Sequence, residues 1–135
     1  MENDRFATLK VFWEGDVVEV GVFWRNRSSL GLGVLALPDR HAVLIGAGQV
    51  SAVVDLVAAE VRDVEFPFMF WGFERAGQKA VELGEVECML RDETGKVVAR
   101  TPVDPPYDYR REGTDLIFRS IVHGETRLDG VYDAA

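Results

Sequence analysis

The chain has 135 residues, of which 47% are hydrophobic and 28% charged, and its formal net charge is -8. These values are typical of a single soluble globular domain spanning residues 1–135, and they exclude an intrinsically disordered chain. The acidic balance argues against nucleic acid and against an anionic membrane surface as binding partners.

Cysteine content and hydropathy indicate the compartment. Cys88 is the single cysteine, so an internal disulfide and a thiolate metal cluster are excluded. The first ten residues lack the basic and apolar regions of a secretory signal, and no apolar run approaches the ~18 residues that cross a bilayer. We therefore expect a cytoplasmic protein with a reduced thiol and without a cofactor or a metal.

The first predicted element is a β-hairpin of residues 5–13 and 16–24 around Glu14-Gly15. Gly15 supplies the positive φ that a two-residue turn favours. On the other face of this hairpin, Lys10 would lie opposite Glu19 as a stabilising pair. The apolar face would consist of the cross-strand pairs Val11–Val18, Leu9–Val20 and Ala7–Val22.

Residues 30–37 and 41–46 predict a second strand pair around Pro38-Asp39-Arg40. Both segments are apolar at consecutive positions rather than at alternate ones. This pattern is typical of strands that are covered on both faces. We therefore expect this pair in the centre of the fold.

Residues 51–62 predict a helix, with Ser51 as its N-cap. An apolar stripe at helical spacing supports the prediction. The β-branched valines favour a strand instead, because they lose χ1 freedom in a helix, and this alternative stays open. The stripe consists of Val50, Val53, Val54, Val57 and Val61.

The Gly46–Ser51 turn has the order of a dinucleotide-binding turn: a strand, then Gly46-x-Gly48, then a predicted helix. The third small residue should be Gly or Ala, yet position 51 holds Ser51. The surrounding segments also predict hairpins rather than a βαβ unit. We interpret Gly46–Ser51 as a plain turn, with a small-ligand or nucleotide-binding domain as an alternative function.

Residues 64–73, VEFPFMFWGF, form the most apolar segment and predict a strand. Pro67 cannot donate a ladder hydrogen bond, so the strand should start there or run along an edge. The segment is interpreted as core, with burial between copies as the alternative. In that alternative the protein is a structural subunit of a homo-oligomer, and Phe68, Met69 and Trp71 are its interface residues.

Residues 84–90 and 96–101 predict another hairpin around Asp92–Gly95. A four-residue loop would place Leu90 opposite Val97. It would also place Cys88 opposite Ala99 and Glu87 opposite Arg100. Cys88 follows the apolar alternation of its strand, which indicates a buried thiol rather than a nucleophile.

Residues 102–114 contain three of the five prolines and predict an irregular loop. Long loops in compact domains are often functional, and Tyr and Arg are the types that dominate binding hot spots. Two aspartates could fix the loop or contact a basic partner. The alternative is a crossover whose tyrosines pack on their own domain. The candidate binding residues are Tyr107, Tyr109, Arg110, Arg111, Asp104 and Asp108.

The remaining segments, 115–122 and 126–132, predict a last hairpin around Gly124, and both histidines, His41 and His123, fall at predicted turns. The fold prediction is mainly β: an antiparallel, hairpin-rich two-layer β-sandwich with one packed helix. The alternative is an α+β fold whose helix covers one face of an antiparallel sheet. For function, the sequence favours a non-enzymatic protein-binding or accessory module that acts through the Tyr/Arg loop.

Overall fold

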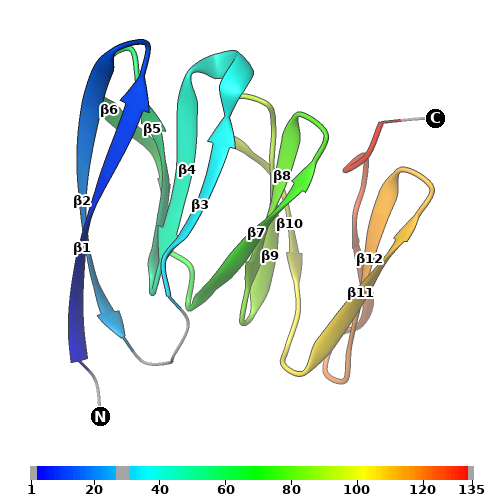
Figure 1. The fold of residues 1–135 in the computed structure, drawn as a ribbon. Helices are drawn as coiled ribbons and strands as arrows, with labels where there is room; N and C mark the ends of the chain where they lie inside the picture. Colours follow the sequence, from blue (N-terminus) through cyan, green and yellow to red (C-terminus); the bar gives the residue numbers. More distant parts are fainter. Residues whose placement is uncertain (1–2, 27–30, 134–135) are drawn as a thin grey trace.

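The computed structural model describes residues 3–26 and 31–133, which form thirteen antiparallel strands in four sheets (Figure 1). The strands are β1 (Asn3–Trp13), β2 (Asp16–Asn26), β3 (Gly33–Leu37), β4 (Ala42–Ala47), β5 (Val50–Asp55), β6 (Glu60–Glu65), β7 (Phe70–Ala76), β8 (Lys79–Gly84), β9 (Glu87–Arg91), β10 (Val97–Pro102), β11 (Tyr107–Glu112), β12 (Asp115–Ser120) and β13 (Gly124–Leu128). A three-residue 3-10 turn, Pro38–Arg40, joins β3 to β4.

The four sheets are stacked face to face in the order of the chain (Figure 1). Their strand orders are β1-β2, β3-β4-β5-β6, β10-β9-β8-β7 and β11-β12-β13. A separate apolar cluster fills each of the three junctions between neighbouring sheets. Packed sheets lie ~10 Å apart, so the two inner sheets are covered on both faces and the two end sheets on one.

The first and last junctions are filled mainly by alternate residues of the facing strands. In the first, Val22 of β2 joins Val43, Ile45 and Val54. In the last, residues of β8 and β9 meet residues of the end sheet β11–β13. The members of this last cluster are Ala76, Val81, Cys88, Leu90, Val103, Leu116, Phe118, Leu128 and Val131.

The prediction of a mainly β, antiparallel fold is confirmed. The predicted helix is wrong, both in the β-sandwich prediction and in the α+β alternative, and the chain forms four stacked sheets instead of two layers. Residues 51–62 form β5, a turn and β6. Val53 and Val54 are both buried, on opposite faces of β5, whereas Val57 and Val61 are exposed. A strand covered on both faces needs apolar residues at consecutive positions, and here these positions also match a helical stripe.

The predicted first hairpin is confirmed with its register. Val11 pairs with Val18, Leu9 with Val20, and Lys10 with Glu19. Glu14 and Gly15 both have positive φ, 47° and 83°, as a two-residue turn of this kind requires. The face predicted to be apolar packs on the sheet β3–β6.

The second strand pair is confirmed, but only one of its strands is central: all six residues of β4 are buried, whereas β3 is an edge strand with exposed alternate residues. Gly33 and Gly46 are paired across β3 and β4. A Cβ at Gly46 would lie 2.3 Å from the Phe70 ring, and one at Gly33 would lie 2.7 Å from it. Because neither glycine has a side chain, the Phe70 ring of β7 can pack against this sheet.

The register predicted for the hairpin of residues 84–101 is wrong by two positions for each of the three predicted pairs. Leu90 pairs with Ala99 rather than with Val97, and Val97 pairs with Arg91. The register shifts between Val97 and Ala99, so Val98 is the extra residue of a β-bulge. The bulge accounts for one of the two positions. The other comes from the loop, because the pairing of Arg91 with Val97 leaves five residues between the strands instead of four.

The predicted loop of residues 102–114 is shorter than expected. Residues 107–112 form strand β11, which pairs along its whole length with β12. The irregular part is confined to residues 103–106 and contains Pro105 and Pro106. Prolines therefore mark the connection between two sheets, and the Tyr/Arg run that follows them is regular β-structure.

The segment 64–73 divides between two sheets. β6 ends at Glu65, β7 starts at Phe70, and residues 66–69 connect them. β7 is an edge strand of its sheet, so the predicted edge position is confirmed. Phe66 and Phe68 lie exposed in the connection.

Candidate functional site

The two tyrosines predicted to bind a partner, Tyr107 and Tyr109, point into the last junction of the stack. The Tyr107 hydroxyl donates to the Gly84 carbonyl (2.7 Å), and its ring stacks on Trp71 at a centroid distance of 5.1 Å. The Tyr109 hydroxyl donates to Glu74. Burial raises the pKa of both phenols, that of Tyr109 to about 12. Both side chains thus contribute to the packing of β11 on its own domain.

The charged residues of the same prediction are divided. Arg110 and Asp108 lie exposed on the outer face of β11, and Arg110 pairs with Glu112 and Glu125. Arg111 covers the Tyr132 ring, with its guanidinium carbon 4.2 Å from the ring centroid. Asp104 is half-buried in the connection that precedes β11. The structure therefore does not gather these six residues into one surface.

The predicted interface residues are also separated. Phe68 is exposed, Met69 is buried and Trp71 is half-buried against Tyr107. A shallow cavity of about 190 Å³ lies between residues 66–69 and 84–87. Of the three predicted residues, Phe68 alone is available to a partner.

The Gly46–Ser51 turn is a tight connection between β4 and β5. Gly48 has a φ of 53°, and its carbonyl accepts a hydrogen bond from the Phe70 amide (2.7 Å). Residues 50–55 continue as a strand, so no helix N-terminus faces the turn. The nucleotide interpretation needs that N-terminus for its phosphate charge, and the geometry gives it no support.

The two histidines and the cysteine, which could in principle serve as bases or as a nucleophile, lie far apart in the stack. His41 precedes β4 and His123 precedes β13, with the sheet β7–β10 between them (Figure 1). Cys88 is buried in the last junction, as predicted, and burial raises the pKa of its thiol. Its Sγ lies 3.5 Å from the Tyr107 hydroxyl, so Cys88 belongs to the packed core.

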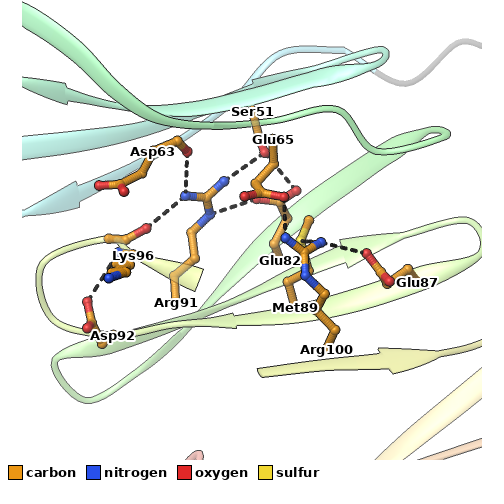
Figure 2. A network of polar contacts seen from close by, with 11 residues as sticks. Ser51, Asp63, Glu65, Glu82, Glu87, Met89, Arg91, Asp92, Lys96 and Arg100 are labelled. Carbon is orange, nitrogen blue, oxygen red and sulfur yellow. Dashed lines mark hydrogen bonds and ion pairs between the residues drawn. The ribbon is translucent and has the colours of Figure 1, made fainter. Parts of the chain in front are cut away.

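A buried polar network at the middle junction was not predicted (Figure 2). Arg91 of β9 and Glu82 of β8 are 0% and 1% exposed, and Arg91 Nε donates to Glu82 Oε1 at 2.9 Å. Ser51 of β5 donates to Glu82 Oε2 (2.8 Å) and accepts from Arg91 Nη2 (2.8 Å). Three groups from two sheets therefore satisfy one another.

The rest of the Arg91 guanidinium is satisfied by backbone. Nη1 donates to the carbonyls of Gly95 (2.7 Å) and Asp63 (3.2 Å) (Figure 2). Burial raises the pKa of Glu82, whereas Arg91 and Ser51 act in the opposite direction. A buried pair of this kind is sealed from substrate and links the sheet β3–β6 to the sheet β7–β10.

A second arginine extends the polar contacts to the surface. Arg100 donates to Glu65 and, at 3.0 Å, to Glu87 (Figure 2). The hydrogen bond to Glu65 raises the pKa of Arg100. Arg100 thus connects β10 to the end of β6, and its charge is balanced within the chain.

The outer face of the β1–β2 hairpin is a regular surface that packing within the described residues does not explain. Phe6, Phe12 and Phe23 are 66%, 77% and 64% exposed, and Val17 is half-exposed beside Phe12. Lys10 and Glu19 pair between them (3.6 Å). This face has eight positions, four from Phe6 to Phe12 and four from Val17 to Phe23. Four of the eight side chains are therefore large and apolar.

The sequence contained a signal for this face. Phe6 and Phe12 occupy the same strand face as Lys10, while Val17 and Phe23 occupy that of Glu19, and this face was identified only by its charge pair. Large apolar side chains exposed together on a sheet mark an interaction surface or an aggregation hazard. We name this surface the aromatic face: Phe6, Thr8, Lys10, Phe12, Val17, Glu19, Gly21 and Phe23.

Within residues 3–26 and 31–133, no group of three or more His, Cys, Asp and Glu side chains is arranged to hold a metal ion. In the same part of the chain, no helix is long and apolar enough to cross a membrane. Comparison with models of protein families, with curated proteins and with solved structures gives no significant match to this chain.

Proposed function

We propose that this protein is a non-enzymatic protein-binding or assembly module that acts through the aromatic face of the β1–β2 hairpin. The observation that carries the proposal is the exposure of Phe6, Phe12 and Phe23 on one side of a regular hairpin whose other side is packed. A cytoplasmic location belongs to the proposal, because the single cysteine is a buried thiol.

The chemistry of the aromatic face favours a protein as the partner. Three rings that are about two-thirds exposed leave on the order of 400 Å² of aromatic surface, divided by the Lys10–Glu19 row into Phe6 with Phe23 and Phe12 with Val17. Interface cores are enriched in aromatic residues and depleted in charge. The face contains one charged pair, Lys10–Glu19, and no unpaired charge among its eight residues.

The aromatic face replaces the Tyr/Arg run as the preferred binding surface. The Tyr107 and Tyr109 hydroxyls already have partners within the chain, and Arg110 is paired with two glutamates. A binding role for the exposed Asp108 and Arg110 stays a prediction. A partner there would compete with the two ion pairs of Arg110, whereas on the aromatic face it would cover apolar rings and a single ion pair, Lys10–Glu19.

Photo-crosslinking tests the proposal. A photoreactive phenylalanine derivative replaces Thr8 in the centre of the aromatic face, and a matched variant carries it at Arg119, on the exposed outer face of the opposite end sheet. We expect a protein adduct from position 8 in cells of the source organism, and none from position 119. The adduct should disappear with Phe12→Ser. Absence of any adduct from position 8 would overturn the proposal.

A further inference from the structure

We propose that the partner of the aromatic face is a second copy of this chain, stacked on it about a two-fold axis parallel to the strands. The inference rests on the proposed function and names its partner. The β1–β2 sheets of the two copies would pack face to face, as neighbouring sheets do within the chain.

The register makes the aromatic face complementary to itself. A two-fold axis along the strands, between β1 and β2, lays each residue of β1 over its own cross-strand partner in the second copy. Phe6 then lies over Phe23, and Phe12 lies over Val17. Packed sheets are rotated by about 30°, which offsets the ends of such strands but keeps their centre aligned.

The polar rows of the face fit the same arrangement. Lys10 pairs with Glu19 in the hairpin, so the axis places Lys10 of each copy over Glu19 of the other. The Phe6 ring lies 3.5 Å from a Cβ position at Gly21, so in this row Thr8 of each copy faces the Phe6 ring that covers the glycine of the other. The rows are thus apolar on apolar, a small side chain on an aromatic ring, or opposite in charge.

The other end of the stack explains why association should stop at two copies. The outer face of β11–β13 carries Arg110 and Arg127 in ion pairs with Glu125 and Asp115. Stacking an aromatic face on it would desolvate these charges without new partners. Two aromatic faces can meet only once, so the assembly is a closed dimer and not a fibre.

The size of the face sets the expected strength. About 400 Å² of aromatic surface in each copy, with the flanking residues, gives a total below the ~1,200 Å² that separates stable interfaces from weak ones. We therefore expect a reversible dimer with a Kd on the order of micromolar to millimolar. High salt should weaken it, because its central row is charged and partly exposed.

Charge complementation tests this geometry. Analytical ultracentrifugation of the unmodified protein should show a concentration-dependent rise from the 15.1 kDa monomer toward twice that mass. Lys10→Glu and Glu19→Lys should each weaken the dimer by at least tenfold, because each places like charges opposite one another. An equimolar mixture of the two variants should regain the affinity of the unmodified protein.

Controls separate this result from a change in fold or net charge. Both variants should keep the circular dichroism of the parent and lower its urea midpoint only slightly, since the like charges that they place opposite one another in the hairpin are exposed. Arg119→Glu changes net charge by as much as Lys10→Glu but lies on the opposite end sheet, and it should leave the dimer intact. A mixture that associates no better than either variant alone would overturn the two-fold geometry.

The outcomes also separate this inference from the proposed function. A chain that stays monomeric at ~1 mM would overturn the second copy as partner. If the crosslinker at position 8 then joined a different protein, the proposed function would stand with another occupant. If it joined nothing, both would fall.

Discussion

The two end sheets of the stack differ in how far the apolar side chains on their outer faces are exposed. Ile117 lies on the outer face of β12 and Phe12 on the outer face of β1, both in sheets with a single packed side. Ile117 is 2% exposed, whereas Phe12 is 77% exposed. The same position in the architecture therefore produces a covered apolar residue at one end and an uncovered one at the other.

The number of strands explains the difference. β12 is the central strand of three, and its register places Ile117 between Arg110 and Arg127. Long arginine stems cover apolar surface while their charged heads stay in water. The β1–β2 hairpin has two strands and no central one, so Phe12 has a neighbour on one side only. In a two-stranded end sheet, such a ring has no second neighbouring strand whose side chains could cover it.

The largest expected effect tests whether the two ends belong to one cooperative unit. Arg91→Met leaves Glu82 buried without its ion-pair partner, and it should lower the free energy of unfolding by about 3–5 kcal/mol. Urea denaturation followed by circular dichroism and by tryptophan fluorescence measures the loss. Coincident transitions would show that both ends unfold together.

The matched control is the double variant Arg91→Met, Glu82→Leu. It removes both charges, so it should regain most of the lost stability. If Arg91→Met were as stable as the parent, the polar network would not link the sheet β3–β6 to the sheet β7–β10. The two ends of the stack would then be independent of one another.

Truncation to alanine at each end tests whether Ile117 is covered and Phe12 uncovered within the monomer. Ile117→Ala removes a covered side chain and should cost about 2–4 kcal/mol. Phe12→Ala removes an exposed one and should change the free energy of unfolding by less than about 0.5 kcal/mol in dilute solution. Urea midpoints of the two variants decide the matter, and equal losses would show that Phe12 is packed within the monomer.

A smaller effect tests whether the N-terminal half is as closely packed as the rest. Gly46→Ala places a methyl group against the Phe70 ring and should cost about 1–3 kcal/mol in thermal or urea unfolding. Gly72→Ala is the control, because a Cβ there meets no atom within 4 Å. If Gly46→Ala were tolerated as well as Gly72→Ala, loose packing rather than position would explain the exposed rings.

Local pairing could be predicted from the sequence where one turn fixed it. Glu14-Gly15 and Pro38–Arg40 each join two strands with little freedom of register, and both pairs were predicted as found. Buried strands gave a weaker signal. Val53 and Val54 fit a helical stripe and a doubly covered strand equally well, and only the stacking of sheets on both sides selects the strand.

The sites were harder to predict than the strands. Arg91 and Glu82 are charged residues in alternating strands, a pattern that normally marks a solvent face, and only their meeting with Ser51 makes burial tolerable. The Tyr/Arg run has the composition of a binding loop. Its pairing with β12 depends on contacts across the sheet that spacing does not show.

The smallest expected effect concerns Tyr109, on the inner face of the end sheet β11–β13. Burial, together with the hydrogen bond to Glu74, raises the pKa of Tyr109 to about 12, above the ~10 of an unfolded tyrosine. The neutral phenol is thus favoured by folding, so its contribution is complete below pH ~10 and is lost as pH rises toward 12. Urea midpoints measured between about pH 9 and 11 should fall less in Tyr109→Phe than in the parent. Equal slopes would mean that Tyr109 ionises as freely as in the unfolded chain, and that this end of the stack is more open than its covered Ile117 indicates.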